Sequence, residues 1–129
     1  MKRKSFVSVI LAALLALTLC GVSQAETFKL GVAGAHSGDL ASYGLPSINA
    51  AELVAEQFNA NGGVLGMQVE VVSQDDQCKP ELATNVTTKM LSDGLTIVLG
   101  HICSGATNAA LPIYKEGNII VMSPSATNP

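Results

Sequence analysis

The chain has 129 residues, with 7 Lys and Arg against 10 Asp and Glu, and a formal net charge of −3 at pH 7. Hydrophobic residues make up 48% of the sequence, but aromatic residues only 4%, and there is no Trp. The core must therefore rest on Val, Ile, Leu and Ala, which suits strands flanked by helices. Beyond the first four residues the few cations are scattered, so the sequence lacks the basic patch that nucleic-acid binding requires.

The N-terminus has the pattern of an export signal. Residues 1–4 are cationic and precede an apolar run over residues 6–19. This run is shorter than the roughly 20 apolar residues that a membrane-spanning helix needs, and small polar residues follow it. Residues 1–25 are therefore predicted to be a cleavable signal peptide, and its removal would change the net charge to 4 − 10 = −6.

Two processing sites are compatible with this signal. Ser23 and Ala25 fit the small-residue pattern of a cleavage site and would leave Glu26 as the mature N-terminus. The alternative is a lipoprotein signal that lipidates Cys20. It is less favoured because the bulky Leu19 stands where a small residue is usual.

The first half of the mature chain reads as strand, helix and strand. Residues 28–33 are rich in β-formers and predict a strand, and the Gly-, Ser- and Asp-rich residues 34–44 predict a loop. Pro46 suits the first turn of a helix, which apolar residues at helical spacing continue as far as residues 59–63. Alternation at period two over residues 67–72 predicts the second strand.

The second half repeats this order. Residues 79–81 begin a helix that residues 93–94 end, and the all-apolar residues 96–100 predict a strand buried on both faces of a parallel sheet. Residues 104–116 then predict a helix and residues 119–122 a strand.

This alternation predicts an α/β fold, namely an open parallel sheet with helices on both faces. Ligands of such sheets bind beyond the carboxyl ends of the strands, where residues 34–44, 75–79, 101–107 and 123–129 would lie. Because the last strand runs at once into a loop at this edge, we expect the domain to be interrupted rather than finished.

Two cysteines follow strand ends on the same edge of the sheet. Cys78 and Cys103 are predicted to form a disulfide, because an exported chain meets an oxidising compartment. Two free buried thiols are the alternative. A bridge requires the two Cα atoms to approach within about 7 Å.

No cofactor or metal is predicted. His101 and the pair Asp75-Asp76 lie near these cysteines, but their spacing matches no zinc motif, and paired cysteines cannot act as ligands. We predict that His101 is packed and hydrogen-bonded, and that the two aspartates are solvated or capping. A secreted serine hydrolase using Ser104 and His101 is a remote alternative, because the segment does not match G-x-S-x-G.

Hydroxyl groups mark the candidate binding site. Ser104 stands at a predicted helix start, and Ser123, Ser125 and Thr127 follow the last strand. Together with free helix N–H groups, these hydroxyls could hold a small anion such as a carboxylate. The alternatives are a plain N-cap for Ser104 and a simple turn around Pro124 for the second cluster.

Six short segments occur in order, behind the export signal, at compatible spacing. They are AGAHSG at residues 33–38, YG at 43–44, NANGG at 59–63, DDQCKP at 75–80, GHICS at 100–104 and SPSAT at 123–127. Together they resemble the leucine/isoleucine/valine-binding proteins of bacterial ABC importers.

The resemblance implies a type I periplasmic binding fold, in which two Rossmann-like lobes close on an amino acid and deliver it to an inner-membrane permease. Residues 26–129 would be the N-terminal part of the first lobe. The expected function is capture of a branched-chain or related amino acid in the periplasm, without catalysis, by a protein that is monomeric at full length. A receptor domain sensing a small amide or organic acid is the alternative.

The resemblance also assigns roles to residues. The Ser104 hydroxyl would bind the ligand carboxylate, Ser125 and Thr127 would bind its carboxylate and ammonium, and Tyr43 would wall the side-chain pocket. The matching cysteines are paired in the family, which supports the predicted bridge.

Two departures from the family pattern bear on binding. Gly105 and Ala106 stand where these proteins often carry serines. The second lobe, which supplies an acidic partner for the ammonium, lies outside this sequence, so we expect residues 26–129 alone to bind leucine weakly or not at all.

Overall fold

The computed structural model describes residues 26–128 of the chain. The predicted signal peptide (residues 1–25), including the alternative lipidation site Cys20, lies outside these residues, as does Pro129. Within the described range, strands and helices alternate in the predicted order. No helix in this range is long and apolar enough to span a membrane.

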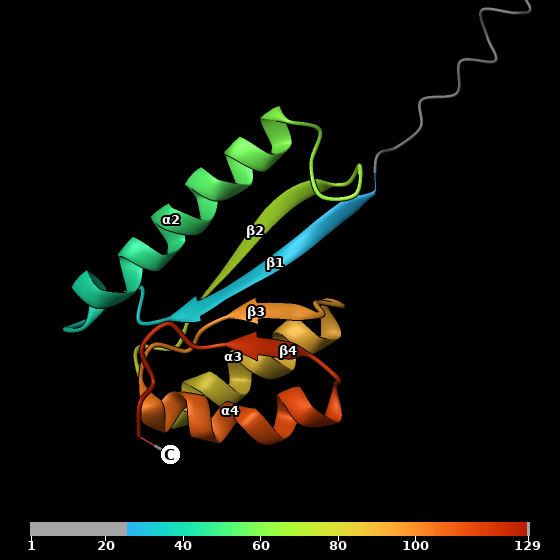
Figure 1. Cartoon of the computed structure of the whole chain (residues 1–129). Helices are drawn as coiled ribbons and strands as arrows, with labels where there is room; N and C mark the ends of the chain where they lie inside the picture. The colour runs from blue at the N-terminus through green and yellow to red at the C-terminus, as the bar shows by residue number, and fades with distance from the viewer. Residues whose placement is uncertain (1–25, 129) are drawn as a thin grey trace, which may run out of the picture.

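The four strands form one parallel sheet, as predicted. Its order is β2-β1-β3-β4, and the arrowheads of β1, β3 and β4 point toward the same edge in Figure 1. The strands are β1 (Thr27–Gly34), β2 (Gln68–Asp75), β3 (Ile97–Leu99) and β4 (Ile120–Met122). β2 extends three residues beyond the prediction because it pairs with β1 along its whole length, from Gln68 to Asp75.

The helices are α2 (Ala41–Ala60), α3 (Pro80–Ser92) and α4 (Ser104–Glu116). α2 begins five residues before Pro46, so the prediction of Pro46 in the first turn was wrong, as was the long loop before it. Turns closed by the N–H groups of Ala41 and Tyr43 start the helix first. Pro46 then removes a single hydrogen bond near the start of a 20-residue helix.

A close backbone contact fixes the start of α2. Gly44 is buried, and a Cβ atom there would lie 1.8 Å from the carbonyl oxygen of Ala35. Only glycine allows the first turn of the helix to lie directly on the loop that follows β1.

Helices cover both faces of the sheet, which confirms the predicted layers (Figure 1). α3 and α4 pack against each other on one face, over a core of buried apolar residues. This core consists of Ala33, Met90, Leu95, Val98, Ala110, Tyr114 and Ile119.

On the other face, α2 packs on β1 and β2. The prediction that residues 96–100 are buried on both faces was therefore only half right. Val98 is 1% exposed on the α3–α4 face, whereas Ile97 and Leu99 remain half-buried. The reason is that α2 does not extend over β3.

Candidate ligand-binding site

The strand order places a topological switch point beside β1. The chain passes from β1 to β2 on one side and then crosses to β3 on the other side of β1. The loops after β1 and β3 therefore leave the sheet in opposite directions, and ligands of open α/β sheets bind in the crevice between such loops.

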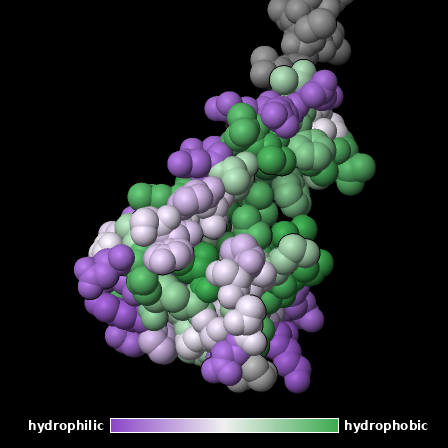
Figure 2. All heavy atoms as spheres, turned by 60° about the vertical axis from the view of Figure 1, so that its left-hand side comes forward, coloured by the Kyte–Doolittle hydropathy of each residue, from purple (hydrophilic) through white to green (hydrophobic). Residues whose placement is uncertain are grey.

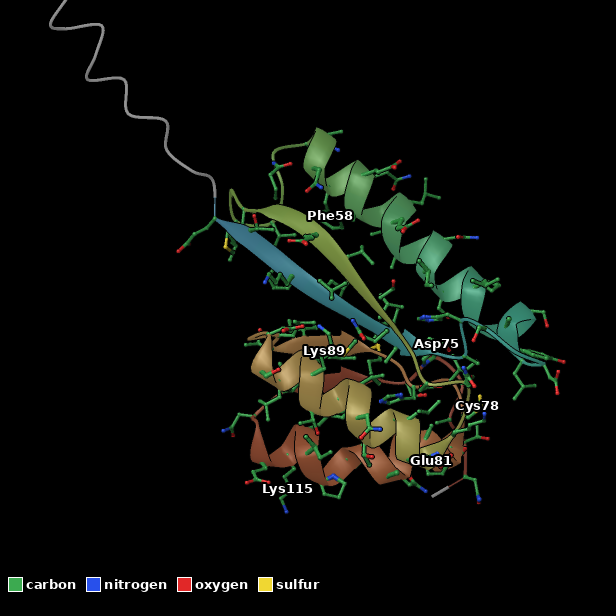
Figure 3. The ribbon with its side chains drawn as sticks, turned by 180° about the vertical axis from the view of Figure 1, so that it is seen from behind. Phe58, Asp75, Cys78, Glu81, Lys89 and Lys115 are labelled. Carbon is green, nitrogen blue, oxygen red and sulfur yellow. A yellow bond between two sulfur atoms is a disulfide. The ribbon has the colours of Figure 1, made fainter. Side chains whose placement is uncertain are left out.

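The loops after β2 and β3 are joined at this edge. Cys78 and Cys103 form a disulfide with Cα atoms 5.4 Å apart, within the limit that a bridge requires. In Figure 3, Asp75 and Cys78 lie close together at the carboxyl end of β2. Because Cys103 immediately precedes α4, the disulfide fixes the start of that helix relative to β2.

A buried polar cluster lies behind the disulfide. His101 and Asp76 are both 0% exposed, and His101 Nδ1 bonds a carboxylate oxygen of Asp76. His101 Nε2 lies 2.9 Å from the Tyr114 hydroxyl and 3.2 Å from that of Thr87. The prediction that His101 is packed and hydrogen-bonded is thus confirmed.

The prediction that both aspartates are solvated or capping was half right for Asp76. Its carboxylate is buried and not solvated, but it does cap the backbone N–H of Cys78. Its burial is tolerated because the imidazole of His101 and the backbone N–H of Cys78 both contact its carboxylate. No sequence signal distinguished Asp76 from its neighbour Asp75.

Asp75 does cap backbone groups. Its carboxylate accepts the N–H groups of His36 (2.8 Å) and Gln77 (3.0 Å) and the hydroxyl of Ser37. Burial alone would raise the pKa of Asp75, but the hydrogen bonds from Ser37, His36 and Gln77 outweigh it and lower that pKa below its ordinary value. Burial also lowers the pKa of His36, against the opposing charges of Asp75 and Asp76.

Ser104 is the first residue of α4, and the N-cap is Cys103, so the interpretation of Ser104 as a plain N-cap was wrong. The Ser104 hydroxyl oxygen instead accepts the N–H groups of Thr127 and Asn128, each at 3.2 Å. This contact brings two of the predicted site residues, Ser104 and Thr127, together.

The segment after β4 folds back over the β3–α4 loop. Ser125 donates its hydroxyl to the carbonyl of Ile102 at 2.7 Å, and Ser123 donates to the carbonyl of His101. Ser123 Oγ also accepts the N–H of Ala126 at 2.9 Å, which closes the turn around Pro124 that was the alternative for this cluster.

A hollow of about 230 Å³ opens at this edge. Its lining residues are Leu40, Tyr43, Ile102, Cys103 and Ser125. Tyr43, which is 71% exposed on α2, and Ser125 thus share one hollow, and the Ser104–Thr127 contact lies beside it. The sequence did not single out Leu40 and Ile102, although both fall in segments predicted to flank the ligand edge.

The cluster gives no support to hydrolysis. Both ring nitrogens of His101 are engaged by Asp76, Thr87 and Tyr114, and the ring is fully buried. His101 is therefore in no position to accept a proton from Ser104. Among residues 26–128, no group of three or more His, Cys, Asp or Glu side chains is arranged to hold a metal ion.

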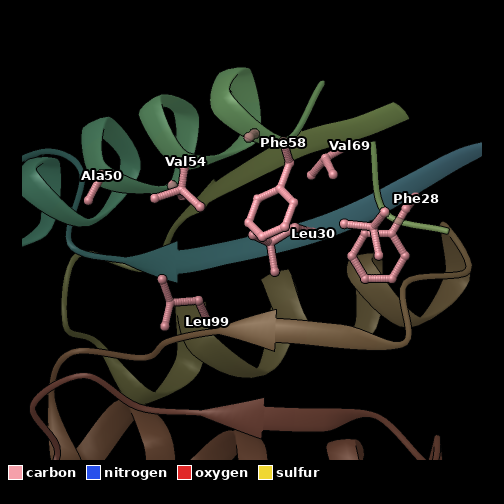
Figure 4. A pocket seen from close by; sticks show the side chains of 10 residues that line it. Phe28, Leu30, Ala50, Val54, Phe58, Val69 and Leu99 are labelled. Atoms are coloured by element: carbon pink, nitrogen blue, oxygen red, sulfur yellow. The ribbon is translucent and has the colours of Figure 1, made fainter. Parts of the chain in front are cut away.

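A second and larger hollow, of about 340 Å³, lies between α2 and the sheet (Figure 4). It is lined by Phe28, Leu30, Ala50, Ala51, Val54, Ala55, Phe58, Val64, Val69 and Leu99. None of these side chains carries a polar group, so this hollow offers nothing to an ionised ligand.

The sequence matches a known protein family over its described length. A family described as periplasmic binding protein matches residues 27–129. The chain is 38% identical to the Leu/Ile/Val-binding protein of Escherichia coli (strain K12) over 120 residues, which cover 93% of the chain and 33% of that protein. It is also 38% identical to the leucine-specific-binding protein of Salmonella typhimurium, over 100% of the chain and 34% of that protein.

Solved structures agree with this match. The branched-chain amino acid transporter substrate-binding protein of Streptococcus pneumoniae, in complex with isoleucine, superposes with a TM-score of 0.76 at 36% identity. The superposition covers 80% of the chain and 30% of that protein. The chain thus spans about a third of the length of its curated relatives.

Proposed function

Because the chain belongs to the periplasmic binding protein family, we propose that it supplies part of the site at which an ABC importer's binding component captures a branched-chain or related amino acid. One observation carries this proposal: Tyr43 and Ser125 line a single hollow at the carboxyl edge of the sheet, beside the contact between Ser104 and Thr127. Relatives named for leucine, isoleucine and valine support the ligand class.

The chemistry of the hollow suits a zwitterion with an aliphatic side chain. Leu40, Ile102 and the ring of Tyr43 offer an apolar wall. The hydroxyl of Ser104 and the free N–H groups at the start of α4 would hold the carboxylate, while Ser125 and Thr127 would bind carboxylate and ammonium. The disulfide keeps this helix start in place.

We further propose that the protein works in the periplasm, exported by residues 1–25, and passes its ligand to an inner-membrane permease as a monomer. A disulfide at the ligand edge is consistent with an oxidising compartment. The periplasmic relatives support the same location.

The proposal can be tested by titrating the isotope-labelled chain with leucine, isoleucine and valine while following backbone amide signals by NMR. Even millimolar binding should shift the signals of Ser104, Ser125 and Thr127. Ser104→Ala should weaken the binding that these shifts report about tenfold or more, since it removes a hydrogen bond to a charged group, about 1.5–3 kcal/mol. Val54→Thr, in the apolar hollow, is the matched control and should leave the titration unchanged.

Two outcomes would count against the proposal. One is a titration that Ser104→Ala leaves unchanged. The other is a set of shifts confined to residues around Phe58 and Val54, which would place binding in the apolar hollow. Stronger shifts with small amides or organic acids than with any amino acid would favour the sensing role instead.

A second variant probes the departure at position 105. A Cβ at Gly105 would meet only Pro80, at 3.9 Å. The position therefore has room for the serine that the family resemblance implies there, and Gly105→Ser should strengthen binding.

A further inference from the structure

The loops after β2 and β3 are connected twice. The disulfide joins Cys78 to Cys103, and the buried pair Asp76–His101 joins the same two loops two residues earlier in each. We propose that His101 is a positioning residue, which holds Cys103 next to Cys78 even when the two thiols are reduced. The disulfide then stabilises this junction between the two loops, which already exists in the reduced chain.

Asp76 fixes the Cys78 side of this junction. Its backbone N–H bonds the carbonyl of Gly34 at 2.9 Å, and its own carbonyl accepts the N–H of Lys79 at 2.8 Å. One carboxylate oxygen accepts the N–H of Cys78 at 2.7 Å, while the other contacts His101. The backbone on both sides of Cys78 is therefore held by Asp76 and not only by sulfur.

His101 fixes the Cys103 side. Its Nδ1 bonds Asp76, and its Nε2 bonds the hydroxyls of Thr87 of α3 and Tyr114 of α4. Its carbonyl accepts the hydroxyls of Thr107 and Ser123. His101 is thus tied to α3, α4 and the segment after β4, and only Ile102 separates it from Cys103.

Burial makes this contact hard to replace. Both side chains are 0% exposed, so the loss of one partner leaves the other buried without compensation. If the contact is lost, the two loops should separate in the reduced chain and the thiols should meet less often. The effective concentration of the Cys78 thiol relative to the Cys103 thiol therefore measures how well His101 holds the two loops together.

The test is a thiol–disulfide equilibrium of the purified chain with glutathione. Cys78 and Cys103 thiols react with one glutathione disulfide, whose S–S bond breaks as the protein S–S bond forms, and the two thiol hydrogens pass to two glutathione molecules. The reduced and oxidised forms are quantified after acid quenching. We expect His101→Phe to lower the effective concentration about tenfold or more, as for loss of a hydrogen bond to a charged group.

Rescue and control variants separate positioning from general stability. His101→Asn places an amide N–H near the position of Nδ1 and should recover much of the loss. Leu95→Ala removes a core side chain that is 2% exposed at the amino end of β3, away from the junction. It should destabilise the chain but leave the effective concentration of the folded thiols unchanged.

Three results would overturn the proposal. They are an unchanged effective concentration in His101→Phe, a drop in Leu95→Ala as large as that in His101→Phe, and no recovery in His101→Asn. Should His101→Phe fail to fold, Asp76→Ala tests the same contact from the other side, because alanine offers no group to His101 Nδ1, and an unchanged value there would be equally decisive. Ligand binding plays no part in the readout, so a failure would leave the proposed function standing.

Discussion

The face of the sheet under α3 and α4 and the face under α2 are built from similar residues but bury them to different degrees. On the first face Met90 and Ala110 are 0% exposed and Tyr114 is 1% exposed. On the second, Ile120 and Met122 of β4, which α2 does not reach, are 66% and 70% exposed. Apolar side chains accordingly reach the surface beside α2 in Figure 2.

The difference shows that coverage, not residue type, decides burial here. Val98 and Leu99 are neighbours in β3, yet Val98 lies in the α3–α4 core while Leu99 lines the open hollow. Polar contacts at its two ends help to hold α2 in place. Asp75 holds the turn before the helix, and the Asn59 side chain bonds the backbone N–H and carbonyl of Val69.

The largest expected contrast comes from truncating an apolar side chain on each face. Met90→Ala should lower the free energy of unfolding by about 2–5 kcal/mol, because it leaves a cavity in the closed core. Val54→Ala, at a 48% exposed position of α2 that lines the open hollow, is the counterpart and should cost less than about 1 kcal/mol. Urea denaturation measures both, and equal losses would mean that the two faces are equally well packed.

An intermediate contrast uses the same chemical change at two positions. Val98→Thr should cost about 1–3 kcal/mol, because it buries a hydroxyl without a partner. Val54→Thr, at a 48% exposed position, should stay within about 0.5 kcal/mol, since water reaches the hydroxyl. Thermal unfolding of the two variants should rank them clearly, and a reversal would show that the surface beside α2 is closed in solution.

The smallest expected effect is the loss of stability at acidic pH through protonation of Asp75. A carboxyl group whose pKa is lower in the folded than in the unfolded chain stabilises the fold above its unfolded pKa of about 3.9, and this contribution is lost as the pH falls through the folded pKa. Asp75→Asn should therefore cost about 1 kcal/mol at pH 7. At a pH below the folded pKa of Asp75, the free energies of unfolding of the variant and the parent chain should become equal.

Amide hydrogen exchange locates this effect. Acid should reduce protection in α2 before α3 and α4, because two of the three hydrogen bonds of Asp75 hold the turn that leads into α2 and only the one to Gln77 lies before α3. Simultaneous loss of protection in all three helices, or an unchanged acid response in Asp75→Asn, would contradict this assignment.

The sequence predicted the parallel sheet, the element order and the bounds of α4. This information lies in the strongly apolar segments and in the Gly, Pro and polar residues that end them. It misplaced the start of α2, because a proline tolerated inside a helix looks the same in sequence as one that begins it. It also overestimated the burial of β3, since coverage by a helix depends on where that helix lies in space.

The site was predictable only in part. The positions of Tyr43 and Ser125 at one edge follow from strand polarity, and so does the approach of Cys78 to Cys103. The pairing of Asp76 with His101 does not, because an aspartate that points into the molecule is indistinguishable in sequence from one that points into water. Only the three-dimensional arrangement of four elements brings Thr87 and Tyr114 to the same ring.

The central place of β1 in the sheet also sets the order of events during synthesis. β1 is made first, yet Thr27 pairs with Gln68, beyond one helix, and Leu30 pairs with Ile97, beyond two. No local hairpin can nucleate such a sheet, and each ladder requires a long loop to close first. The first strand to be translated therefore waits unpaired until residues 68–75 have been made, and its other edge stays uncovered until residues 97–99 have been made.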